Sequence, residues 1–225
     1  MIGNLMFAVY KSRRDLLKFV VFGSGLGAAG LIEVAPALAQ NARVDVEQLM
    51  AEGALPDVVE GQANAPVTVV EYASMTCSHC AAFATKVYPT LKSKYIDTGK
   101  AKLILREFPL DPLATAGFML ARCSGDKREA MIELLFAQQK NWAFVDKPLD
   151  GLLNVVKQTG MTQETFERCL KDQALYDKIN MVRDRGAEKF GVNATPTFFI
   201  NGKRVSGEMT VEQLDKEIAP LLPKG

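Results

Sequence analysis

Four consecutive residues, Cys77-Ser78-His79-Cys80, carry the strongest chemical signal in this sequence. Two cysteines separated by two residues, between a strand-like apolar run and a helix-like one, are typical of a redox motif. Unpaired N–H groups and the positive end of the dipole at a helix N-terminus favour a thiolate, so Cys77 is predicted to be the nucleophile. Cys80 lies one turn further in and is predicted to resolve the mixed disulfide.

His79 is the single histidine of the chain. Placed between the two sulfurs, as a cation or a hydrogen-bond donor, it is expected to favour the Cys77 thiolate and so make the disulfide a stronger oxidant. A structural disulfide or half of a zinc site stays open as an alternative. Zinc usually takes a second Cys-x-x-Cys or a histidine pair, and Cys123 and Cys169 stand alone. We therefore expect no metal and no cofactor beyond the redox-active cysteine pair.

The elements that position the motif are predicted to be a strand at 67–73, a helix at 78–95 and a strand at 102–108. Pro89 is expected to kink the helix because proline lacks the N–H and clashes with the preceding turn. A strand–helix–strand unit of this length implies two parallel strands joined by a right-handed crossover.

The rest of the chain extends this unit. A short strand is expected at 57–60, and apolar residues recur at helical spacing from about 112 to 191. Sheet structure resumes at 197–200, and Asn201-Gly202 predicts a hairpin to 204–206. A closing helix is expected at 210–222. The predicted class is α/β, in the order β-α-β, a helical insertion, then β-β-α.

The first 39 residues have the features of an export signal, which is excluded from the fold. Basic residues precede an apolar run at 19–32, and a small-x-small cleavage site ends at Ala39. The pair Arg13-Arg14 resembles the bacterial twin-arginine signal; an ordinary secretory signal and an uncleaved anchor are the alternatives. The apolar run is shorter than the ~20 residues that a membrane span needs. Outside the cytoplasm disulfides persist, so the cysteines are expected to be catalytic or paired.

Size and charge narrow the function classes. The chain has 225 residues, 48% of them hydrophobic and 24% charged, which suits a globular protein with a sizeable core. Its net charge of +1 suggests no nucleic-acid partner and no anionic membrane surface.

Two separated stretches together resemble one family. The motif at 77–80 at a helix start and Thr195-Pro196 within 195–202 downstream are similar to the thioredoxin fold, and the helical block between them resembles the DsbA type of periplasmic disulfide-forming oxidoreductases. The resemblance covers about 55–225. It implies a thioredoxin fold with an inserted helical domain, divided as a lead-in at 40–56, a first half at 57–110, the insertion at 111–190 and a second half at 191–225.

The resemblance also implies site residues. In this family the loop proline is cis and faces the active-site sulfurs, which assigns that place to Pro196. The backbone of Thr195 would then pair with an extended substrate segment beside Cys77. The family's best-known motif has proline where this chain has Ser78, and the two middle residues tune the potential.

Glu71 lies six residues before Cys77, where the family has a buried acid. Strand alternation agrees, because it places Glu71 in one row with Val67 and Val69. A buried carboxylate has a raised pKa and can exchange protons near neutral pH, so Glu71 is predicted to accept the proton of Cys80 when that thiol attacks. The alternative is a solvated residue at a sheet edge.

Cys123 and Cys169 both fall in the helical insertion. An exported domain rarely leaves two such thiols free, and some members of the family carry a second disulfide here, so the resemblance implies a Cys123–Cys169 bridge. The alternative is two cysteines that pack separately as small apolar residues.

The function that the resemblance implies is an exported thiol oxidase. It would pass its disulfide to reduced, unfolded exported proteins and be reoxidised by a membrane quinone-linked, DsbB-like partner. A reductase or isomerase on the same fold is the first alternative; only the 40–56 segment precedes the first strand, which favours a monomer and thus an oxidase. A peptide-binding chaperone with an inert disulfide is the second. A glutathione-transferase-like enzyme is disfavoured by Cys80, which that class usually lacks.

Overall fold

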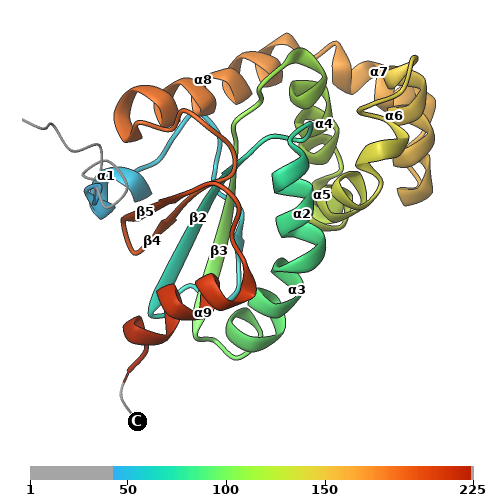
Figure 1. The fold of residues 1–225 in the computed structure, drawn as a ribbon. Helices are drawn as coiled ribbons and strands as arrows, with labels where there is room; N and C mark the ends of the chain where they lie inside the picture. The colour runs from blue at the N-terminus through green and yellow to red at the C-terminus, as the bar shows by residue number, and fades with distance from the viewer. Residues whose placement is uncertain (1–42, 224–225) are drawn as a thin grey trace, which may run out of the picture. The chain divides into compact units, whose positions relative to one another are not determined.

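The computed structural model describes residues 43–223 of the chain. One sheet in this region has the strand order β1-β3-β2-β4-β5. Strands β2 and β3 are parallel, and the other neighbouring pairs are antiparallel (Figure 1). The strands are β1 (Val59–Glu60), β2 (Val67–Ala73), β3 (Ala101–Glu107), β4 (Thr197–Ile200) and β5 (Lys203–Ser206).

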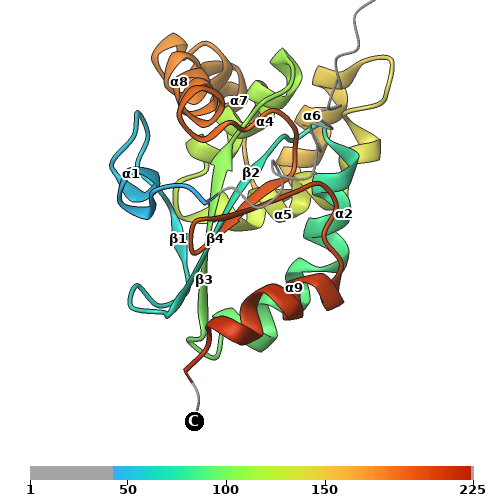
Figure 2. The same cartoon turned by 60° about the vertical axis from the view of Figure 1, so that its left-hand side comes forward.

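Helices cover both faces of the sheet (Figures 1 and 2). Apolar side chains of α2, α3 and α9 pack on one face, and those of α1 and the end of α8 pack on the other. A separate apolar core lies among the helices that follow β3 and precede β4 in the sequence. The helices are α1 (Val46–Met50), α2 (Ser78–Lys86), α3 (Tyr88–Leu91), α4 (Pro112–Cys123), α5 (Arg128–Ala137), α6 (Pro148–Val156), α7 (Gln163–Leu170), α8 (Gln173–Phe190) and α9 (Val211–Ile218).

Strand β2 is the centre of this arrangement. Its β-branched residues suit a pleated strand that is covered on both faces: Val67 and Val69 pack toward α2 and α3, whereas Val70 and Tyr72 pack toward α1 and α8. Gly186 lets α8 approach, because a Cβ there would stand 2.7 Å from the Tyr72 ring. This packing on both faces fixes the carboxyl end of β2 beneath the cysteine motif.

The helix predicted at 78–95 is interrupted next to Pro89, where the kink was expected, and its last turn is not α-helical. Helix α2 ends at Lys86, Val87 separates the two helices with φ −110° and ψ −43°, and α3 begins at Tyr88 with Pro89 in its first turn. A π-helical turn, η2 (Lys92–Ile96), follows. Proline lacks the N–H that would continue the α2 hydrogen-bond ladder, so the α-helix is interrupted here.

The predicted order of elements is confirmed. Five α-helices, α4 to α8, separate β3 from β4 within the described residues. Asn201 and Gly202 both have positive φ, 44° and 81°, as the tight turn between β4 and β5 requires. The predicted closing helix is shorter than 210–222, because α9 gives way to a 3-10 turn over Ala219–Leu221.

The export signal predicted at 1–39 lies outside the described residues. Within residues 43–223, no helix is both long and apolar enough to cross a membrane.

Candidate active site

Cys77 and Cys80 occupy the junction between β2 and α2. Cys77 is the N-cap residue of α2, with an extended backbone at φ −81° and ψ 120°. Its thiol is partly exposed, whereas Cys80 is fully buried, and both thiols are free. The Cys77 sulfur can therefore contact another protein, whereas the buried Cys80 sulfur can react only with a group bound at Cys77.

The surroundings separate the acidities of the two thiols. A hydrogen bond from Cys80 lowers the pKa of Cys77 most; burial opposes it, and Thr195 and the backbone N–H groups of Cys80 and His79 add to the lowering. The resulting pKa of Cys77 is about 5, so this group is a thiolate at neutral pH. Burial raises the pKa of Cys80, and that thiol stays protonated. These acidities suit a nucleophile at 77 and a resolving thiol at 80.

A cis peptide bond joins Thr195 and Pro196 beside the nucleophile. Sγ of Cys77 lies 3.3 Å from the carbonyl oxygen of Thr195 and donates to it when the thiol is protonated. The sequence places these residues 118 positions apart, and the pairing of β4 with β2 brings them together. Backbone next to an exposed sulfur can hold an extended peptide segment in position for attack.

Glu71 is buried beneath the motif on the central strand β2, with 2% of its surface exposed. The alternative of a solvated edge residue is therefore wrong. Its Oε1 atom has no hydrogen-bond partner among the described residues. Burial raises the pKa of Glu71 to about 8, and the negative charge of Cys77 contributes. At neutral pH this carboxyl group is mostly protonated and can exchange its proton.

Comparison with known proteins agrees with this geometry. A family model described as thioredoxin matches residues 54–219. The crystal structure of Wolbachia pipientis alpha-DsbA1 superposes with a TM-score of 0.72 at 30% identity, covering 78% of this chain and 94% of that one. The chain belongs to the DsbA-type thioredoxin family.

Two curated relatives carry names from disulfide chemistry. A Rickettsia bellii protein assigned as a protein-disulfide oxidoreductase is 35% identical over 150 residues, which is 65% of this chain and 57% of that protein. The chain thus spans somewhat over half the length of that relative. A Bacillus anthracis protein assigned as disulfide bond formation protein D is 29% identical over 70% of this chain and 76% of its own length.

The two middle residues of the motif lie at the surface. Ser78 is exposed at the first position of α2. The His79 side chain is 61% exposed, and its Nδ1 lies 3.6 Å from Oε2 of Glu208. The contribution of His79 to the low pKa of Cys77 comes from its backbone N–H. The expectation of an imidazole held between the two sulfurs is thus replaced by an imidazole facing Glu208.

Gln139 is a site residue that the sequence did not indicate. It is 4% exposed in the turn after α5, and its Nε2 donates to the carbonyl oxygens of Met75 at 2.8 Å and Cys77 at 3.0 Å. The helical insertion of this family member therefore fixes the loop that carries the nucleophile. No local pattern marks Gln139, because its partners lie more than 60 positions away.

The second cysteine pair forms a disulfide between Cys123 at the end of α4 and Cys169 in α7, which are 46 positions apart. The alternative of two separately packed thiols is wrong. Within the described residues, no group of three or more His, Cys, Asp or Glu side chains could hold a metal ion.

Proposed function

We propose that this protein is an exported thiol:disulfide oxidoreductase that donates its Cys77–Cys80 disulfide to folding proteins. The observation that carries the proposal is the pairing of a partly exposed Cys77, pKa about 5, with a buried Cys80. A thiolate of this kind is a stable leaving group, and a stable reduced form makes the disulfide an oxidant. The assignments of the Rickettsia and Bacillus relatives support the same chemistry.

The first half of the cycle transfers two electrons from substrate to protein. A substrate thiolate attacks Sγ of Cys77, the Cys77–Cys80 bond breaks, and the Cys80 sulfur leaves with the electron pair. Glu71, protonated below its pKa of about 8, gives Cys80 a proton. A second substrate thiolate then attacks the substrate sulfur of the mixed disulfide, so the substrate disulfide forms and Cys77 leaves as a thiolate.

The second half restores the disulfide. The Cys77 thiolate attacks a disulfide of the reoxidising partner, which we propose to be a membrane quinone-linked, DsbB-like protein. Cys80 then gives its proton to the Glu71 carboxylate and attacks Cys77, and the partner leaves reduced. The proposed substrates are reduced, unfolded exported proteins held beside Thr195 and Pro196, in the periplasm, with the oxidoreductase acting as a monomer and with no cofactor beyond the cysteine pair.

The test is single-turnover oxidation of a reduced, unfolded two-cysteine protein. The oxidised wild type should form the substrate disulfide, and Cys77→Ala should abolish it, since no other exposed free thiol exists within residues 43–223. Cys80→Ala should instead accumulate the mixed disulfide on Cys77 during reaction with an oxidised partner. A wild type that forms no substrate disulfide, but binds the unfolded protein as tightly as Cys77→Ala does, would support the peptide-binding chaperone.

A further inference from the structure

Residues 74–77, which join β2 to α2, form a turn that carries one active-site sulfur and contacts the other; it is called the nucleophile turn. The N–H of Cys77 donates to the carbonyl oxygen of Ser74 at 3.1 Å and closes the turn. Burial raises the pKa of Cys80 most, and a hydrogen bond from the Ser74 backbone acts in the opposite direction. A displacement of the nucleophile turn would therefore move Cys77 and change the surroundings of Cys80.

A chain of hydrogen bonds ties the side chains of this turn to the start of the helical insertion. The N–H of Leu110 donates to Oγ of Ser74 at 3.3 Å. Oγ of Ser74 lies 3.3 Å from Oγ1 of Thr76. The Thr76 hydroxyl in turn donates to Oδ2 of Asp111 at 2.6 Å. An ionised carboxylate only accepts hydrogen bonds, so Thr76 gives its single proton to Asp111 and accepts one from Ser74. The charge of Asp111 thus fixes the direction of the whole chain.

Asp111 is itself held in place by α4. It is the N-cap residue of that helix, and its Oδ1 accepts from the N–H of Ala114 at 2.8 Å. Pro112 suits the first helical position, because the N–H that proline lacks has no partner within the helix there. Gly117 lets α4 lie close to the nucleophile turn, since a Cβ there would stand 3.1 Å from Cγ of Met75. One carboxylate oxygen of Asp111 therefore serves the helix, and the other serves the turn.

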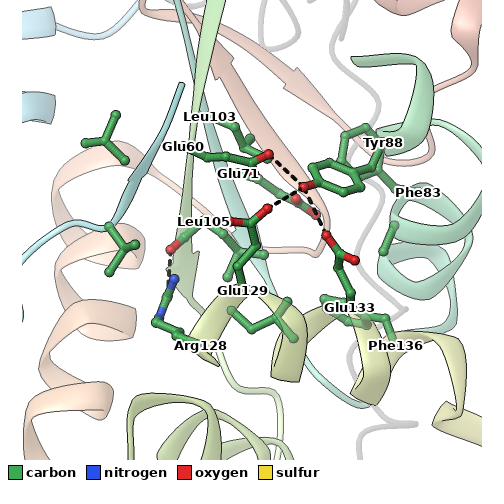
Figure 3. Close-up of a pocket in the computed structure, with 14 residues that line it drawn as sticks. Glu60, Glu71, Phe83, Tyr88, Leu103, Leu105, Arg128, Glu129, Glu133 and Phe136 are labelled. Carbon is green, nitrogen blue, oxygen red and sulfur yellow. Dashed lines mark hydrogen bonds between the residues drawn. The ribbon is translucent and has the colours of Figure 1, made fainter. Parts of the chain in front are cut away.

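The other polar side chains of the site act at different places. Glu71 lines a cavity between the sheet, α2 and α5 (Figure 3). Gln139 binds the nucleophile turn through the main-chain oxygens of Met75 and Cys77. In the described part of the chain, Asp111 is the charged group that hydrogen-bonds to a side chain of this turn. Its contact is thus separate from those of Glu71 and Gln139.

We propose that Asp111 is a positioning residue for the exchange reaction, which holds the nucleophile turn through Thr76 and so fixes where the Cys77 sulfur lies. The proposal rests on the proposed function, because the reaction is the one at Cys77. The N–H groups of His79 and Cys80 hydrogen-bond to this sulfur, and their alignment depends on where the turn places it. The sulfur changes its charge and its covalent partner during the cycle, whereas the hydrogen bonds of Asp111 lie outside the reacting atoms. Asp111 takes no part in proton or electron transfer.

Two variants break the link between Asp111 and Thr76, and two leave it intact. Thr76→Val removes the hydroxyl but keeps the side-chain shape and the α4 cap, whereas Asp111→Ala removes link and cap together. Thr76→Ser keeps a hydroxyl that can donate to Asp111. Asp172→Ala is the matched control, since Asp172 caps α8 by accepting from the N–H of Leu175 at 2.9 Å. Melting temperatures show that each variant folds, and the loss of either cap should lower them to a similar extent.

Two readouts report the surroundings of the Cys77 sulfur. The first is its acid dissociation constant, from the ultraviolet absorbance of the thiolate as a function of pH. The second is the equilibrium constant of the Cys77–Cys80 disulfide with glutathione. Thr76→Val and Asp111→Ala should lower the first constant by about three- to tenfold, a small part of the ~10⁴-fold between the ordinary pKa of 9 and about 5. The second should shift toward the disulfide by a similar factor, because a less stable thiolate makes a weaker oxidant.

The outcomes separate the positioning role from the helix cap and from the proposed function. Shifts in Thr76→Val and Asp111→Ala, with values close to those of the wild type in Thr76→Ser and Asp172→Ala, support the role. Wild-type constants in Thr76→Val refute it while the oxidase stands, even where Asp111→Ala shifts, because the α4 cap alone would then explain that shift. A wild type whose Cys77–Cys80 disulfide does not oxidise substrate thiols overturns the proposed function and the role of Asp111 together.

Discussion

At the scale of single residues, the site rests on two ionisable groups whose acidities are shifted in opposite directions. Cys77 has a pKa of about 5, and Glu71 one of about 8. The charge of either disfavours the charge of the other. At neutral pH the site therefore holds one negative charge, on the sulfur that meets substrate, and one neutral acid beside the sulfur that leaves.

Replacing Glu71 tests this division of charge. Glu71→Gln should slow release of the mixed disulfide by Cys80 without abolishing the first attack on Cys77, because the group that exchanges a proton with Cys80 is lost while the partly exposed Cys77 sulfur is unchanged. Stopped-flow or acid-quench kinetics of release measure the effect. Glu208→Gln is the control, since it removes an exposed carboxylate near His79. Release kinetics equal to those of the wild type would exclude the role.

The same substitution has a stability signature. The folded pKa of Glu71, about 8, is raised above its ordinary 4.5. Its contribution to stability is therefore fully present below pH 4.5 and is lost as pH rises toward 8, by about 3 kcal/mol at pH 7. Glu71→Gln should flatten this part of the profile in urea unfolding; an unchanged slope would show a solvated carboxylate.

The reactive residues of the site were predictable from the sequence, but the residues that contact and position them were not. Spacing indicated Cys77 and Cys80, and strand alternation placed Glu71 on a buried row. The imidazole of His79 was misplaced, because its exposed position and contact with Glu208 depend on a loop that follows β5. Gln139 carries no sequence pattern, since its partners lie at the β2–α2 junction.

At the scale of elements, the turn after α5 controls the β2–α2 junction. Gln139 is the contact that links them, through the carbonyl oxygens of Met75 and Cys77. The Cys77 oxygen also accepts from the N–H of Ala81 at 3.1 Å, so Met75 depends on Gln139 more strongly. Fixing these carbonyls holds the first turn of α2 in place around the thiolate.

Gln139→Ala should loosen that turn. We expect the pKa of Cys77 to rise from about 5 toward its ordinary 9, because the N–H groups of the first turn are less well aimed. The lost buried hydrogen bonds should lower the unfolding free energy by about 1–3 kcal/mol. The pH dependence of the ultraviolet absorbance of the thiolate measures the pKa of Cys77. Gln138→Ala is the control, because Gln138 bonds the exposed Gln158; equal pKa values in both variants would contradict the role.

Element order was predictable because local signals and topology agree. The parallel pairing of β2 with β3 follows from the crossover, and the β4–β5 turn from Asn201-Gly202. The break at Val87 was predictable from Pro89. The π-helical turn after Leu91 was not, since it depends on how this segment packs against the sheet and α9.

At the scale of the molecule, the helical insertion contains a disulfide bond of its own. The Cys123–Cys169 disulfide joins α4 to α7 and closes a long loop. Changing both cysteines to alanine should lower the unfolding free energy of the protein by about 4 kcal/mol in the chain-entropy model. Denaturant unfolding measures it, and thiol counting on denatured wild type should find both sulfurs blocked. Two reactive thiols at these positions would contradict the bridge.

The most direct test of the account is the equilibrium reduction potential of Cys77–Cys80 against glutathione, on protein beginning at Gln40. Members of the superfamily anchor the scale, with DsbA at about −120 mV and thioredoxin at about −270 mV. A Cys77 thiolate stabilised by Cys80 and by the α2 N-terminus predicts a value toward the DsbA end. A value near that of thioredoxin would contradict the oxidase and favour a reductase or isomerase.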